Sequence, residues 1–269
     1  MAFLHRHRWL TPYLLLAPGI GFLVLFFVVP LYYLANTSLQ EDVGTFDFVF
    51  TWAWDNYSDS IRQFHEQFLR SLEYAGIATG LTLAISYPLA YWIATRGGRW
   101  KNLLLLFIIA PFFVTYLIRT LAWLTILSDD GRLLATSTAV VAGITYNYLP
   151  FMALPLYVSI EQIDRRLIEA AQDLYASRAK AFIRVTLPLS LPGVFAGSLL
   201  TFIPAVGDFI NAQLLGTPRQ FMIGNVIQSR FLALGEYGEA AALSIVVMGA
   251  VLVLILIYAR VLGTERLTG

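Results

Sequence analysis

Two charged residues, Arg119 and Asp208, lie inside long apolar stretches of this sequence. An uncompensated charge in hydrocarbon costs a few kcal/mol or more, so such residues are usually paired or functional. At the rise of an α-helix, Arg119 is roughly 27 Å beyond Lys101 and Asp208 roughly 24 Å beyond Pro192. The two are therefore at similar depth, and we expect them to face the interior of a helix bundle and to approach each other. They form a structural pair, line the path of a solute, or snorkel separately toward an interface.

Motifs for catalysis, nucleotide binding and metal binding are absent from the sequence. It contains no GxxxxGK[ST] loop and no GxSxG elbow, and His65-Glu66-Gln67-Phe68-Leu69 lacks the second histidine of a HExxH zinc site. Three histidines and no cysteine provide neither a metal centre nor thiol chemistry. We therefore expect a chain that is not an enzyme and binds no cofactor or metal itself.

The composition indicates a protein surrounded by lipid. Hydrophobic residues make up 58% of the 269 residues and charged residues only 13%, about half the charge of a soluble domain. A spanning helix needs roughly 20 mainly apolar residues. Six stretches meet this requirement, namely 13–35, 71–95, 102–127, 138–160, 193–215 and 241–262. The predicted fold is an all-α membrane protein of about six transmembrane helices. The net charge of +1 gives no reason to expect a nucleic-acid partner.

The positions of lysine and arginine predict the orientation of these helices. If the N-terminus is cytoplasmic, twelve of the 18 basic residues fall in inner segments, five fall in outer segments, and Arg119 lies within a span. The positive-inside rule then places both termini in the cytoplasm. The first apolar stretch is too long for a signal peptide, so we interpret it as an uncleaved anchor.

This topology divides the chain into segments. We predict a cytoplasmic N-terminus and anchor helix at 1–35, an aromatic-rich outer loop at 36–65, a five-helix core at 66–262 and a cytoplasmic tail at 263–269. The core includes an unusually long inner segment, residues 160–188.

The 160–188 segment has the pattern of two short helices. Ser177 can cap a second helix that runs through Phe182 and ends at Pro188. An ordered pair of helices is what a docking site for a cytosolic partner requires, whereas the alternative is a helix lying on lipid headgroups. The first helix is predicted from the apolar spacing of Ile160, Ile163, Leu167, Ala171 and Leu174.

Several residues of this segment resemble the EAA loop of binding-protein-dependent ABC importer permeases of type I. They are Glu169-Ala170-Ala171, Asp173-Leu174, Phe182, Leu187-Pro188 and Pro192-Gly193. In that family the loop forms a coupling helix inserted into a cleft of the ATP-binding subunit. This chain departs from the family at Tyr175, where a glycine is usual. Glycine suits a left-handed turn, so the tyrosine must adopt another turn or accept strain.

The resemblance implies an N-terminal anchor helix followed by the five-helix permease core of a type I importer, in a bacterial cytoplasmic membrane. It implies a second, homologous permease subunit, two cytosolic ATP-binding subunits that use ATP and Mg, and an extracytoplasmic substrate-binding protein. The residues expected to contact the ATP-binding subunit are Arg165, Glu169, Ala170, Ala171, Asp173, Leu174, Ser177 and Phe182.

Within the family, the runs Ile118–Trp123 and Pro204–Phe209 look most like spermidine/putrescine permeases. An ammonium group is held by carboxylates and by aromatic faces. Thiamine and ferric-iron permeases share parts of the pattern and stay open as alternatives, as does an ion-coupled secondary transporter. Pro204 and Gly207 are expected to loosen the fifth span, which favours a pore-lining helix there. The expected substrate path comprises Arg119, Trp123, Tyr146 and Asp208.

Overall fold

The computed structural model describes residues 11–44 and 47–262, which fall into two compact units. The predicted tail at 263–269 and the first ten residues of the predicted N-terminal segment lie outside the described residues, as do the basic residues used there for orientation. Among described residues, the first unit comprises 11–44, 47–63 and 229–249, and the second comprises 64–228 and 250–262.

The first unit contains an apolar helix, a small hairpin and the ends of two longer helices. The helix from Leu15 to Thr37 has no buried residue in its most apolar part, as expected of a helix that faces lipid. Strands β1 and β2 are antiparallel, with Gln40 opposite Phe50. The elements are α2 (Thr11–Leu23), the π-helix η1 (Val24–Val28), α3 (Val29–Thr37), β1 (Gln40–Gly44), β2 (Asp47–Phe50), the π-helix η6 (Ser229–Leu234) and the start of α13 (Tyr237–Leu262).

The predicted outer loop at 36–65 is more ordered than expected. It contains the hairpin and the first residues of α4 (Asp55–Arg96), which has one non-helical residue at Phe64. The Asn56 amide donates hydrogen bonds to the carbonyl oxygens of Ser38 (3.0 Å) and Gln40 (2.9 Å). These bonds tie the start of the hairpin, and Ser38 just before it, to the helix that follows.

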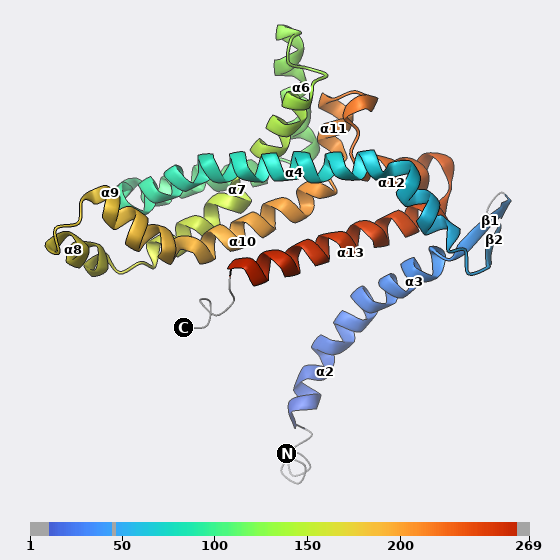
Figure 1. Cartoon of the computed structure of the whole chain (residues 1–269), viewed down its shortest axis with the longest axis horizontal. Coiled ribbons are helices and arrows are strands. Elements are labelled where there is room, and N and C mark those ends of the chain that lie inside the picture. Colours follow the sequence, from blue (N-terminus) through green and yellow to red (C-terminus); the bar gives the residue numbers. More distant parts are fainter. Residues whose placement is uncertain (1–10, 45–46, 263–269) are drawn as a thin grey trace. The chain divides into compact units, whose positions relative to one another are not determined.

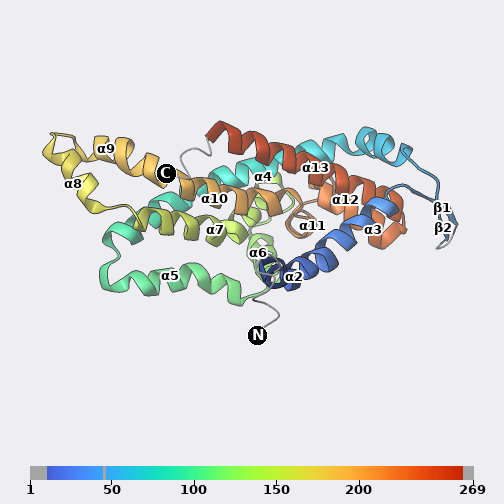
Figure 2. The same cartoon turned by 90° about the horizontal axis from the view of Figure 1, so that it is seen from below.

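The second unit is a bundle in which α4, α7 and α10 run side by side, with α8 and α9 at one end (Figures 1 and 2). Besides the remainder of α4 and α13, its elements are η2 (Gly98–Trp100), α5 (Lys101–Ile109), η3 (Ala110–Phe113), α6 (Tyr116–Asp130), α7 (Ser137–Glu161), α8 (Arg165–Asp173), α9 (Arg178–Ala181), the π-helix η4 (Phe182–Thr186), α10 (Leu187–Val206), α11 (Ile210–Leu215), η5 (Pro218–Gln220) and α12 (Ile223–Gln228).

The helical membrane fold is confirmed, although one predicted span is broken. Within the described residues, five helices are long and apolar enough to cross a membrane, and a bent pair brings the total to six. The predicted span at 102–127 is not one continuous helix, because the chain bends by 93° between Phe113 and Tyr116. Val114 and Thr115 are extended, and Pro111 cannot supply the backbone donor that a continuous helix requires.

The predicted span at 193–215 also ends early. The α10 helix stops at Val206, and α11 starts as a separate helix at Ile210. Pro204 and Gly207 lie at this end of α10, which confirms that the helix is interrupted where the sequence predicted loosening. Asp208 therefore lies in a break between two helices and not within a helix.

Close approach of α7 and α10 organises the core of the second unit. A Cβ atom built on Gly193 would lie 2.5 Å from Ser159 Cβ and 2.8 Å from the Pro155 carbonyl oxygen. One built on Gly197 would lie 2.7 Å from Met152 Sδ. Small residues at such contacts let helices pack in lipid, where there is no hydrophobic drive between them.

Replacement of Gly193 by alanine should therefore destabilise the protein by about 1–3 kcal/mol, as overpacking does in other cores. The midpoint of unfolding in detergent measures the effect. Gly80→Ala is the matched control, because no neighbouring atom lies within 4 Å of its added Cβ. Equal midpoints for the two variants would contradict the packing argument.

Candidate functional site

The first candidate site is the α8 helix and the turn that follows it. Asp164 caps α8 by accepting a hydrogen bond from the Arg166 amide (2.9 Å). The helix starts later than its apolar spacing predicted, because Ile160 is buried in the last turn of α7. The residues between Glu161 and Arg165 break the helix.

The turn after α8 is a Schellman motif with tyrosine in the left-handed position. The Ala176 amide donates to the Ala171 carbonyl oxygen (3.0 Å) and the Tyr175 amide to that of Gln172 (2.9 Å), which is the pair of bonds that defines this motif. Tyr175 has φ of 64°. Of the two possibilities left by the sequence, the tyrosine thus accepts the strained conformation, at a cost of roughly 1–2 kcal/mol.

The second short helix begins as predicted but does not end at Pro188. Ser177 caps α9 by accepting from the Lys180 amide (3.3 Å). The chain then stays helical from Arg178 to Val206. Pro188 is tolerated because η4 is a π-helix, in which the Leu187 amide bonds five residues back to Phe182. This wider turn accommodates a proline that would break a regular α-helix.

The residues predicted to contact an ATP-binding subunit divide into two groups. Arg165 and Phe182 contact this chain itself, since Arg165 donates to the Ala94 carbonyl oxygen (3.4 Å) and the Phe182 ring lies 5.3 Å from that of Tyr91. They fasten the segment to α4. Arg165 is nevertheless exposed, as are Glu169, Ala170, Asp173, Leu174 and Ser177, whereas Ala171 is half-buried.

The second candidate site is a buried polar cluster around Asp208, which is 5% exposed. The Tyr116 hydroxyl donates to the carboxylate, as does the Asn211 side-chain amide (2.9 Å). Asn211 also contacts Thr120 and Asn147, at 3.4 and 3.3 Å. The cluster joins α6, α7 and α11 across the break after α10.

Arg119 belongs to the same cluster but makes no ion pair with Asp208 in the part of the chain that the structure describes. It donates to the Asn147 carbonyl oxygen (3.4 Å), and its guanidinium carbon lies 5.6 Å from the centre of the Tyr116 ring. Tyr116 thus contacts both charges. The expected approach occurs through a shared partner, which favours the structural interpretation of the two residues.

Asn147, Asn211 and Thr120 were missed by the sequence analysis. Neutral amides and hydroxyls need no partner of opposite charge, so they were not singled out as a charged residue in an apolar stretch is. The position of Asn211 three residues after Asp208 was the one available signal. At that spacing an aspartate carboxylate can accept a hydrogen bond from the later residue, as it does in a helix cap.

The other two predicted path residues form a separate contact. The rings of Trp123 and Tyr146 lie 5.6 Å apart, edge to face. Tyr146 also lines an apolar pocket of about 300 Å³ together with residues of α4 and α5. Of the predicted path residues, the structure therefore joins Arg119 with Asp208, and Trp123 with Tyr146.

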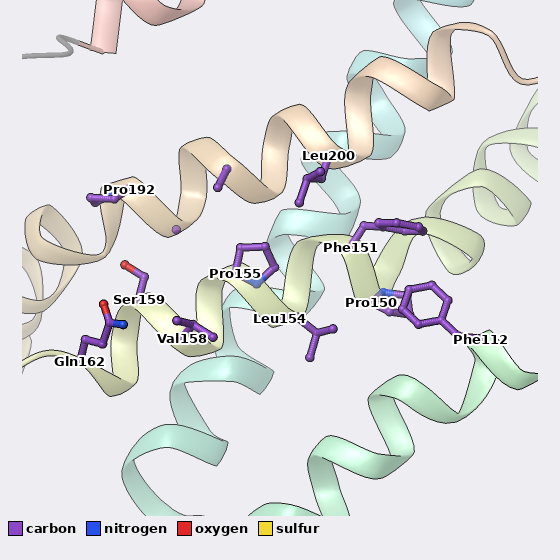
Figure 3. Close-up of a pocket in the computed structure, with 12 residues that line it drawn as sticks. Phe112, Pro150, Phe151, Leu154, Pro155, Val158, Ser159, Gln162, Pro192 and Leu200 are labelled. Carbon is purple, nitrogen blue, oxygen red and sulfur yellow. The ribbon is translucent and has the colours of Figure 1, made fainter. Parts of the chain in front are cut away.

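A larger apolar groove of about 590 Å³ lies along α7 and α10 (Figure 3). Ser159 and Gln162, near the α8 end of α7, are its polar side chains among the described residues. None of the four predicted path residues lines it. The described lining is Phe112, Pro150, Phe151, Leu154, Pro155, Val158, Ser159, Gln162, Pro192, Gly193, Ala196 and Leu200.

Comparison with known proteins identifies relatives over nearly the whole chain. Residues 86–264 match the family described as "Binding-protein-dependent transport system inner membrane component". The spermidine/putrescine transport system permease protein PotB of Escherichia coli K12 is 37% identical over 260 residues, covering 90% of this chain and 94% of that protein. PotB of Haemophilus influenzae is also 37% identical, covering 89% of this chain and 90% of that protein.

A solved structure confirms the fold. A chain of a bacterial alginate ABC transporter, in complex with an alginate pentasaccharide-bound periplasmic protein, superposes with a TM-score of 0.70. The alignment covers 99% of this chain and 97% of that one, at 21% identity. At this level of sequence identity the match shows that the two chains share a fold, and nothing further.

Asp208→Ala should lower stability by about 1–3 kcal/mol, because it leaves the Tyr116 hydroxyl and the Asn211 amide as buried donors without their acceptor. Unfolding in detergent measures the loss. Asp129→Ala removes an exposed carboxylate from α6 and should leave the midpoint unchanged. An Asp208→Ala protein as stable as the wild type would show that the cluster does not hold the helices together.

Proposed function

Because the chain belongs to the family of binding-protein-dependent transport system inner membrane components, we propose that it is the polyamine-transporting permease subunit of an ATP-driven importer. The observation that carries the proposal is the 37% identity to spermidine/putrescine permeases along nearly the full length of both chains. The chain itself contributes the path and the site of coupling, and ATP and Mg are used by a partner. Its N- and C-termini lie in the cytoplasm.

The proposed complex contains a second permease, two cytosolic ATP-binding subunits and an outer substrate-binding protein. The solved alginate transporter was crystallised with a periplasmic protein, which supports the last of these. The exposed leucines of this segment support the ATP-binding subunits, since Leu167 in α8 is 50% exposed and Leu174, directly after α8, is 82% exposed. Two exposed leucines on one short helical segment are typical of a contact with another protein.

The proposed coupling is mechanical. The chain is continuously helical from Arg178 to Val206, so displacement of α8 and α9 is transmitted to α10. Phe182 packs against Tyr87 and Tyr91, with ring centres at 5.9 and 5.3 Å, and therefore carries the same displacement to α4. Closure of the ATP-binding subunits would draw the α8 helices of two permeases together and open the path outward, and hydrolysis would reset it.

The buried cluster bears on the choice among rival mechanisms. An ion-coupled secondary transporter needs a titratable group that is accessible from the path. Asp208 is the candidate, and its carboxylate is occupied by Tyr116 and Asn211. This arrangement favours an importer driven from the α8 end over one driven by an ion within the membrane.

Glu169→Lys should abolish co-purification of the ATP-binding subunit and with it uptake, because the reversed charge lies on the outer side of α8. Asp129→Lys is the matched control, as it reverses an exposed charge on α6, which lies away from α8 in both views (Figures 1 and 2). If Glu169→Lys retained both the ATPase and transport, the coupling role of α8 would be wrong.

Uptake of radiolabelled spermidine into cells or proteoliposomes carrying the complex should be competed by unlabelled putrescine. Unlabelled thiamine or ferric iron should not compete, because neither is an aliphatic polycation. Uptake of radiolabelled thiamine or ferric iron by the same complex, without uptake of spermidine, would assign the permease to another solute of the same family.

A further inference from the structure

We propose that the ring of Tyr175 is an aromatic contact by which this permease binds its ATP-binding subunit. The inference rests on the proposed function, since it assigns a residue to the partner interface of α8. It starts from an observation on the backbone. Tyr175 occupies a left-handed conformation, with φ of 64°, in a turn where glycine would be unstrained.

The strain is not compensated within the described chain. Tyr175 is 98% exposed, so its ring removes almost no apolar surface from water. Residues held in unfavourable backbone conformations persist where the surroundings enforce them, and such residues cluster at functional sites. A side chain that contributes nothing to the fold, at a position where its presence is costly, points to a contact outside the chain.

The turn presents the ring in a fixed place. Two backbone hydrogen bonds close it, from Ala176 to Ala171 and from Tyr175 to Gln172, and Ser177 caps the next helix. Leu174 is 82% exposed beside the ring. Leu167 lies in α8 and is 50% exposed, seven residues before Leu174, which is the residue that caps the C-terminal end of this helix. The three side chains make an apolar face that ends in an aromatic ring, a residue type enriched at interface hot spots.

The charges around the turn favour a protein over lipid as the occupant of this face. Glu169 and Asp173 precede the ring on α8, and Arg178 and Lys180 follow it on α9. A helix that lies on lipid headgroups is mainly basic on its polar face, whereas a mixture of both signs is what a complementary protein surface can match. The turn lies at the end of the second unit where α8 and α9 project past α7 and α10 (Figures 1 and 2).

The test uses the permease pair in nanodiscs, and the affinity of its ATP-binding subunit is measured by biolayer interferometry. Tyr175→Ala removes the ring and keeps the strain of the left-handed residue. Tyr175→Gly removes the ring and the strain, and Tyr175→Phe keeps the ring and the strain. We expect the first two to weaken binding at least about tenfold, as loss of a hot-spot residue does, and Tyr175→Phe to bind within about twofold of the wild type. Tyr33→Ala, which removes another exposed tyrosine from α3, should bind as the wild type does.

Each contrary outcome has a distinct meaning. Tyr175→Gly binding as tightly as the wild type would show that the tyrosine is merely tolerated, and would overturn the inference. An effect present in nanodiscs but lost in detergent would place the ring on lipid and overturn it as well. If the wild-type pair bound no ATP-binding subunit at all, the proposed function would fail. Amide hydrogen exchange at Ala176 verifies that the turn persists in every variant.

Discussion

Unpaired backbone groups in hydrocarbon cost several kcal/mol each, and this constraint governs how the chain can leave its helices. The backbone hydrogen bonds of the helix stop after α10, and side chains form hydrogen bonds with the backbone groups that follow. The Asp208 carboxylate accepts a hydrogen bond from the backbone amide of Asn211 (3.0 Å). The Asn225 side chain donates to the Phe209 carbonyl oxygen (2.8 Å) and accepts from the backbone amide of Met222 (3.0 Å). The Asp208 carboxylate is therefore needed by the backbone at this break before any contact with a solute is considered.

The close contact of α7 and α10 has a consequence at the opposite end of the second unit. Gly193 and Gly197 bring the two helices together, and α10 continues without interruption into η4 and α9. Arg165 and Phe182 attach the same segment to α4. A force applied to α8 is thus distributed over three packed helices. A flexible connecting loop would absorb such a force, so the order of this segment is what makes mechanical coupling physically reasonable.

The sequence predicted features that depend on local chemistry. Hydropathy located α7 within one residue at each end, because a long apolar helix leaves an unbroken signal. The cap at Ser177 followed from its hydroxyl preceding a short helix. The conflict at Tyr175 followed from the steric preference of a left-handed turn. The failures involved helices that change direction. Hydropathy is the same on both sides of the bend between Phe113 and Tyr116, and a π-helix that accommodates Pro188 has no pattern of its own.

The buried cluster shows what sequence alone determines and what it leaves open. The presence of Arg119 and Asp208 in apolar stretches determined that two charges had to be compensated within the bundle, because hydrocarbon does not solvate them. Only the tertiary structure decided how. Tyr116 contacts both charges, and Asn147, Asn211 and Thr120 complete the cluster from three helices. Hydrogen bonds between residues that are far apart in the chain depend on how the helices cross, and helix crossings are set by packing, which no local pattern encodes.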